Sequence, residues 1–223
     1  MKKDFYHQLP EGYVADKTID AKEIKFGVLL NIAAAVIMIT SYIIVDLIVA
    51  GRITFQEAFF SVFEPEKEKV AEFIYRAFLP IIIILPSMVI YVILHELLHG
   101  AAYKILTRAK LSFGITWSAA YCGVPNIYVG KKTAFIALLT PFSVFNVIFI
   151  VLIVLTKTAP LGILPRIMFA MHLGGCAGDL YVTALLIFKY RGDVLTQDEG
   201  TKQTFYARKY KDKITEQNVD FSA

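Results

Sequence analysis

The sequence IIIILPSMVIYVILHELLHG, residues 81–100, joins a long apolar run to the motif His95-Glu96-Leu97-Leu98-His99. On a helix, residues four apart share one face, so both imidazoles can reach one Zn²⁺ ion. Glu96 then lies beside the open coordination position, where it can take a proton from water. The alternative is a helix end whose polar residues only mark the lipid boundary. Because two of the four histidines in the chain fall in this motif, we favour the metal site.

The composition of the chain predicts a membrane protein. Of its 223 residues, 57% are hydrophobic, and the mean hydropathy of +0.58 is too high for an ordinary soluble domain. Four segments reach the roughly 20 apolar residues that cross a bilayer. They lie at about Phe26–Ala50, Val70–Leu106, Thr133–Leu155 and Leu161–Phe188. We therefore expect an all-α integral membrane bundle of about four transmembrane helices, in a single domain over residues 26–188.

The basic residues lie mostly on one side of these segments. Seventeen of the 23 lysines and arginines fall in the tail 1–25, the tail 189–223 or the stretch 104–132. Such an excess is typical of cytoplasmic segments, so we expect a multi-pass protein of the cell membrane with both termini in the cytoplasm. The expected external loop contains Glu57, Glu64, Glu66 and Glu68. Because the basic residues are spread between apolar segments, they favour topology determinants over a nucleic-acid-binding patch, and no nucleic acid partner is expected.

A zinc site needs a third protein ligand, and the sequence offers few. The first acidic residue after the motif is Asp179, which lies inside the fourth apolar segment. An ionised Asp within a span costs about 2.5–3.5 kcal/mol on insertion scales, so it needs a partner. Asp179 and His95 lie ten and nine residues before the next lysine of their segments, which gives them comparable depths. We therefore predict His95, His99 and Asp179 as ligands of one Zn²⁺ per chain.

Other residues of the spans leave alternatives open. His172 shares a helix face with Asp179 but lies two turns away, so it would join the site, bind water or contact another helix. Cys176 could approach the metal as a thiolate, although a small buried cysteine is the commoner case. The glycines at 174, 175 and 178 favour close helix packing. For Asp46, near the outer boundary of the first span, we expect an interfacial or helix contact.

A different periodicity predicts a β-hairpin at about 110–130. From Leu111 to Cys122, apolar residues alternate with small or polar ones, which is a strand pattern, and 127–129 could return as a second strand. Open strand edges are not tolerated against lipid, so the hairpin must face protein, the interface or a wet cavity. A strand edge beside a metal site could hold a peptide substrate by β-addition at about 111–122. The alternative is a hairpin that only connects two spans.

Four stretches of the chain resemble a known family. HELLHG, KLSFGITW, ALLTPF and GGCAGDLYV are similar to segments of the bacterial putative zincin peptidases, small four-span membrane proteins that are themselves similar to site-2-type intramembrane metalloproteases. The resemblance covers about Phe26 to Tyr206. It implies that His95 and His99 are zinc ligands, that Glu96 is the catalytic acid/base, and that Asp179 is the third ligand.

The sequence thus predicts a zinc-dependent, membrane-embedded metallopeptidase that hydrolyses peptide bonds of membrane or membrane-proximal substrates. Zn²⁺ would activate a water molecule and polarise the scissile carbonyl, while Glu96 would pass the proton of that water to the leaving amine. One alternative is a zinc-binding membrane scaffold or regulator that does not cut its partner. A metal transporter is a weaker alternative, because one site does not make a chain of ligands across the bilayer.

Overall fold

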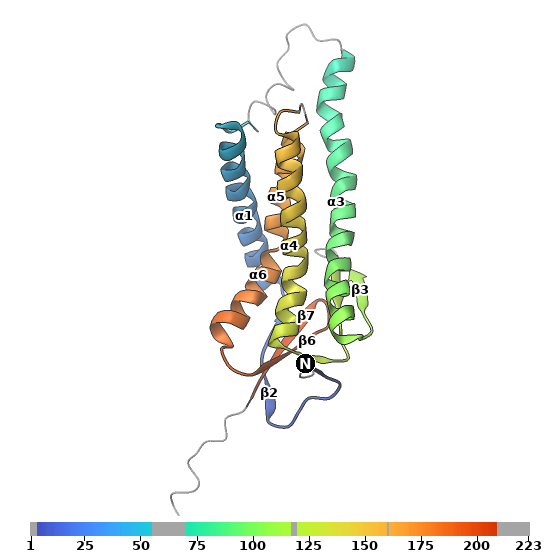
Figure 1. Ribbon diagram of the computed structural model, residues 1–223, viewed down its shortest axis with the longest axis vertical. Coiled ribbons are helices and arrows are strands. Elements are labelled where there is room, and N and C mark those ends of the chain that lie inside the picture. Colours follow the sequence, from blue (N-terminus) through green and yellow to red (C-terminus); the bar gives the residue numbers. More distant parts are fainter. Residues whose placement is uncertain (1–3, 55–69, 117–119, 160, 209–223) are drawn as a thin grey trace, which may run out of the picture.

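The computed structural model describes residues 4–54, 70–116, 120–159 and 161–208, which form a helical bundle with a small β-sheet at one end (Figure 1). The helices are α1 (Ile24–Ala50), α3 (Val70–Thr107), α4 (Lys131–Thr156), α5 (Ile163–Gly175), α6 (Ala177–Ala184) and the π-helical turn η1 (Leu185–Lys189). The strands are β1 (Phe5–Tyr6), β2 (Tyr13–Asp20), β3 (Ser112–Ile115), β4 (Ala120–Gly123), β5 (Tyr128–Gly130), β6 (Val194–Asp198) and β7 (Lys202–Arg208).

Three of the described helices, α1, α3 and α4, are long and apolar enough to cross a membrane, and a fourth span exists if α5 and the following helix count as one. The segment expected at 161–188 as the fourth span is a pair of helices, because the chain bends by 40° between Gly175 and Ala177. Backbone hydrogen bonds continue across the bend, from Cys176 N–H to the His172 carbonyl and from Leu180 N–H to the Cys176 carbonyl. The bend starts a new helix, and Asp179 lies in its first turn.

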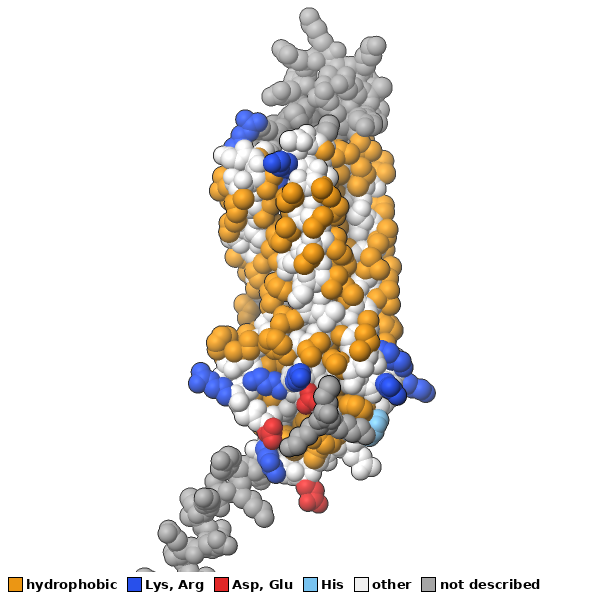
Figure 2. All heavy atoms as spheres, in the orientation of Figure 1, with side chains coloured by type: hydrophobic (Ala, Val, Ile, Leu, Met, Phe, Trp, Pro, Cys, Tyr) orange, Lys and Arg blue, Asp and Glu red, His pale blue; other side chains and the backbone are white. Residues whose placement is uncertain are grey.

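The surface of the bundle is compatible with a multi-pass membrane protein. Figure 2 shows hydrophobic side chains along the length of the helices, and lysines and arginines gathered toward the end that carries the sheet. Large apolar residues such as Ile48 and Ile82 are 77% and 65% exposed. A soluble protein rarely exposes so continuous an apolar surface, whereas a lipid-facing surface requires it. The predicted external glutamates lie outside the described residues.

The end of the bundle carries a sheet that the sequence did not predict. Its strand order is β1-β5-β6-β7-β2, and all neighbours are antiparallel. The expectation of an all-α bundle with one hairpin was therefore incomplete, because four of these five strands come from the two tails. Tail strands that pair across long sequence distances, as β2 does with β7, leave only weak local signals. The first and last described strands share this sheet, so they lie at the same end of the bundle (Figure 1).

A β-hairpin lies within residues 110–130, but its two strands are not the ones expected. Strands β3 and β4 pair antiparallel, with Phe113 opposite Cys122. The alternating run therefore folds back on itself and does not make one long strand, because periodicity alone does not locate a turn. The stretch expected to return to it instead forms β5, which pairs with β1 and β6. Residues 117–119, between β3 and β4, lie outside the described residues.

A buried cluster joins the sheet to the helix ends. It includes Tyr103 of α3, Leu186 of η1 and Phe205 of β7, which are at most 1% exposed. At the start of α4, the side chain of Asp4 accepts hydrogen bonds from the backbone and hydroxyl of Thr133, each 2.9 Å long. The sheet is therefore packed against the part of the bundle that contains the motif of α3.

Candidate metal centre

The two histidines of the α3 motif meet on its buried face. His95 and His99 are each 8% exposed, and their Nε2 atoms lie 3.2 Å apart. The intervening residues Leu97 and Leu98 pack elsewhere, and Leu97 is 49% exposed on the apolar surface. The 3.6-residue period of the helix thus brings together the two imidazoles that the motif predicts.

Asp179 joins the two histidines from the other side of the bend. Its Oδ2 atom lies 3.2 Å from His95 Nε2 and 3.4 Å from His99 Nε2. The carboxylate is in the first turn of α6, where the unpaired N–H groups of a helix favour negative charge. The bend between α5 and α6 therefore places an acidic residue at the depth of the α3 motif.

The spacing and chemistry of these three atoms fit a zinc ion. In a tetrahedral site with Zn–N bonds of about 2.0–2.1 Å, neighbouring ligand atoms are about 3.3–3.4 Å apart. The three measured separations are 3.2, 3.2 and 3.4 Å. The described residues contain one other group with metal-binding geometry, His95 with His172 and Cys176, which shares a ligand with the first. The ligand roles of His95, His99 and Asp179 stay predictions, but the fold brings the three residues together.

A carbonyl group of α4 fixes the orientation of His99. The Nδ1 atom of His99 lies 2.8 Å from the carbonyl oxygen of Ala137, which can only accept a hydrogen bond. The His99 proton must therefore be on Nδ1, which leaves the Nε2 lone pair for a metal. Pro141 lies four residues after Ala137 and has no N–H, so the helix cannot use this carbonyl. The proline thus frees the acceptor that orients the histidine.

Glu96 lies on the wall of a cavity beside the two motif histidines. The cavity has a volume of about 170 Å³ and lies between the sheet and the adjoining ends of α1, α3, α4 and α6. It is lined by polar residues that include Glu96, His99, Asp179 and Asp198. The backbone of Cys122 in β4 hydrogen-bonds the Glu96 carboxylate. The cavity thus brings the Glu96 carboxylate, two of the three potential ligands and strand β4 together, with room for several water molecules.

Asp198 is a residue of this cavity to which sequence reasoning gave no role. Its two carboxylate oxygens accept hydrogen bonds of 2.9 Å from the Tyr103 hydroxyl and the Gly200 N–H. Burial raises the pKa of Asp198 to about 6, although both hydrogen bonds oppose this rise. The only sequence signal was an acidic residue before a turn glycine, which is common in loops. The tail sheet is what carries Asp198 to the site.

The remaining candidates lie outside the triad of ligands. His172 is fully buried, and its ring centre is 6.4 Å from that of His95. Cys176 is a buried free thiol, 3.6 Å from His172 Nδ1. Asp46 is also fully buried and pairs with Arg166 of α5 and with the backbone and hydroxyl of Thr54. This ion pair joins α1 to α5, as expected for a helix contact.

Comparison with known proteins identifies the segment that contains the site. Residues 88–194 match the family described as "putative zincin peptidase", which confirms the resemblance found in the sequence. The matched segment includes the α3 motif and Asp179. No curated protein and no solved structure matches the chain.

Proposed function

Because residues 88–194 belong to the putative zincin peptidase family, we propose that this protein is a zinc-dependent metallopeptidase embedded in the membrane. The observation that carries the proposal is the triangle of His95, His99 and Asp179 atoms, with sides of 3.2–3.4 Å, beside the Glu96 carboxylate. Two imidazole nitrogens and a carboxylate oxygen thus converge on one point, and this is a ligand set that catalytic zinc sites use.

The chemistry follows from the residues around the cavity. A bound Zn²⁺ would polarise the scissile carbonyl and make water easier to deprotonate. Glu96 would hold a water molecule in the cavity, take its proton and deliver that proton to the leaving amine. The Cys122 backbone would keep the Glu96 carboxylate directed to the cavity. The apolar walls that α1 contributes, including Leu30, would limit the number of competing water molecules.

A peptide substrate would bind along β4. Among the described strands β4 pairs with β3 alone, and its residues Ala120, Tyr121 and Cys122 line the cavity. An extended peptide could therefore lie along the part of β4 that lines the cavity and place a backbone carbonyl near the three ligand atoms. The substrates would be membrane or membrane-proximal proteins, because the site lies about 12–18 Å inside the end of α3 at 1.5 Å per residue.

The cavity would open to the cytoplasm. The described basic residues gather toward the end of the bundle that carries the sheet (Figure 2), and this excess is typical of the cytoplasmic side. Single cysteines at Arg108 and Lys202 should then react with thiol reagents only after the cell membrane is made permeable. Labelling of either position in intact cells would contradict the orientation.

Substrate trapping tests the proposed peptidase function. The Glu96→Gln variant keeps a side chain of the same shape but loses the base, so it should bind zinc and hold its substrate uncut. Membrane proteins recovered with Glu96→Gln should be full-length, and mass spectrometry should find shortened forms of the same proteins with the wild type. If the wild type and Glu96→Gln recover the same partner uncut, the protein is a zinc-binding scaffold and not a peptidase.

A further inference from the structure

A hydrogen-bonded chain lies behind His95, on the side away from the other ligands. The hydroxyl of Tyr91 is 3.1 Å from His95 Nδ1 and 2.9 Å from His172 Nδ1. Tyr91 comes from α3 one turn before His95, and His172 comes from α5. The function proposed above uses neither residue, although both are buried deep in the bundle.

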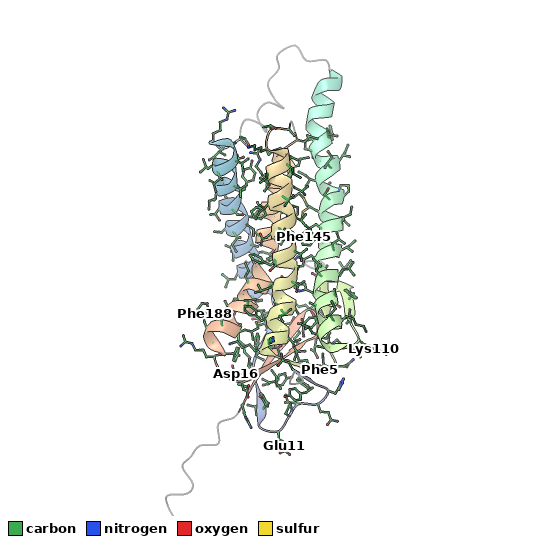
Figure 3. All side chains as sticks on the ribbon, viewed as in Figure 1. Phe5, Glu11, Asp16, Lys110, Phe145 and Phe188 are labelled. Atoms are coloured by element: carbon green, nitrogen blue, oxygen red, sulfur yellow. The ribbon has the colours of Figure 1, made fainter. Side chains whose placement is uncertain are left out.

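The surroundings of this chain exclude water. Tyr91 is 6% exposed and His172 is fully buried. Phe145 and Phe149 of α4 lie 5.6 and 5.7 Å from the His172 ring, and the Phe145 ring is 4.8 Å from that of Tyr91. Phe145, labelled in Figure 3, lies midway along the bundle. Polar groups buried in such an apolar setting cost free energy unless they are hydrogen-bonded. Each polar atom of Tyr91 and His172 therefore favours the proton arrangement that gives it a partner.

The protons of this chain can be assigned from the metal outward. A metal at His95 Nε2 requires the ring proton to be on Nδ1, where it is donated to the Tyr91 oxygen. The Tyr91 hydroxyl proton is then free to be donated to His172 Nδ1. His172 carries its own proton on Nε2, where it makes no hydrogen bond of ordinary geometry but interacts with the backbone of Phe142.

The reverse arrangement would block the metal site. If the Tyr91 hydroxyl donated to His95, the His95 proton would be on Nε2, between the other two ligands. The Ala137 carbonyl can only accept a hydrogen bond, so it fixes the proton of His99 on Nδ1. The Tyr91 hydroxyl can both donate and accept, so by itself it does not fix the proton of His95. The direction of its hydrogen bond is therefore set by what lies behind it, and His172 supplies an acceptor there.

We propose that Tyr91 and His172 are positioning residues, which hold His95 in the tautomer and orientation that bind zinc. This inference rests on the proposed function only in that His95 must be a metal ligand. Tyr91 acts on His95 directly, and His172 acts through Tyr91. Residues that hydrogen-bond a metal ligand and hold its orientation commonly contribute about 10–100-fold to metal affinity.

The same cluster has a competing use as a second metal site. Potential ligand atoms of His95, His172 and Cys176 lie within 4.8 Å of one another. The Tyr91 hydroxyl, however, is within 3.1 Å of both Nδ1 atoms and fills the space that an ion would need. The proposal therefore predicts one zinc ion per chain, measured by metal analysis of the purified protein. Two ions per chain, with one lost in Cys176→Ala, would overturn it.

Zinc affinity in detergent, measured by competition with a chelator, tests the proposal without any peptidase assay. Tyr91→Phe should weaken zinc binding about 10–100-fold, and His172→Leu by up to about tenfold. His172→Asn, which keeps an acceptor near the Nδ1 position, should restore most of the loss. Tyr103→Phe is the matched control, because it removes a hydroxyl of the same helix that bonds Asp198 and no predicted ligand.

A double variant separates this role from general packing. If His172 acts through Tyr91, then Tyr91→Phe/His172→Leu should bind zinc as Tyr91→Phe does, because the second change removes nothing further. Additive losses, or wild-type affinity in Tyr91→Phe, would overturn the proposal. Nitrogen NMR of histidines in the zinc-loaded wild type gives an independent result: His95 should carry its proton on Nδ1 and His172 on Nε2. A His172 proton on Nδ1 would also overturn it, even if a variant failed to fold.

Discussion

Replacing Pro141 with alanine should change protein stability and zinc affinity in opposite directions. The new N–H at position 141 would bond the Ala137 carbonyl, which now accepts the His99 Nδ1–H at 2.8 Å. Weakening this contact should raise the zinc dissociation constant about tenfold or more, or about 1.4 kcal/mol. For the metal-free protein, the loss of a helix-interior proline gains about 3 kcal/mol. The two buried methylene groups lost with the ring offset about 1.6 kcal/mol, so the net gain should be about 1.4 kcal/mol.

Chelator competition and thermal unfolding of the metal-free protein measure the two effects on Pro141→Ala. Pro86→Ala is the matched control, because Pro86 also interrupts a helix but frees the carbonyl of Ile82, which is on the exposed apolar surface. This control should stabilise the protein and leave zinc affinity unchanged. If Pro141→Ala bound zinc as tightly as the wild type, the Ala137 carbonyl would not orient His99, and the reasoning would be refuted.

Three other predictions concern the third ligand, helix packing and the cavity acid. Asp179→Ala should abolish zinc occupancy at zinc concentrations that saturate the wild type, while the metal site of His172→Leu should still be occupied at excess zinc. The reverse result in metal analysis would make His172 the ligand. Gly174→Ala should destabilise the protein by about 1–3 kcal/mol in thermal unfolding, because its Cβ would lie 2.7 Å from the Ala34 carbonyl, whereas Gly27→Ala meets nothing nearer than 3.6 Å and should not. The pKa of Asp198 in the folded protein, about 6, lies above its ordinary 3.8, so folding binds a proton and stability should fall as pH rises from about 4 to 6. Asp198→Asn should flatten this dependence in melting curves, and an unchanged pH profile would contradict the assignment.

The helical part of the fold and the candidate ligands could be predicted from the sequence because both have strong local signals. A lipid-crossing helix needs a long apolar run, and such runs match α1, α3 and α4. The spacing of His95 and His99 is a property of one helix. Asp179 could be found because an acidic residue within an apolar segment is costly, and the distance to a basic boundary residue gave its depth. Each of these inferences needs only a few neighbouring residues.

The remaining features depend on contacts between distant parts of the chain. Strand β2 is stabilised by pairing with β7, almost two hundred residues away. The sequence of each tail alone therefore indicates a polar segment and no sheet. The bend at Cys176 has no nearby proline from which it could have been predicted. Tyr91 looks like one more apolar residue of its helix, and nothing near it in sequence indicates His172. A proline such as Pro141 in an apolar run indicates at most a kink, whereas its effect on the Ala137 carbonyl depends on His99 lying beside α4.

Hydrolysis by purified, zinc-loaded protein measures the central claim most directly. Wild type and Glu96→Gln would be reconstituted in lipid vesicles with equal zinc content, verified by metal analysis, and given a panel of membrane-anchored peptides. The account predicts cleavage by the wild type, followed by mass spectrometry of the products, and a loss of at least about a hundredfold in Glu96→Gln, which keeps its zinc. Equal rates for the two proteins, with zinc present in both, would contradict the account.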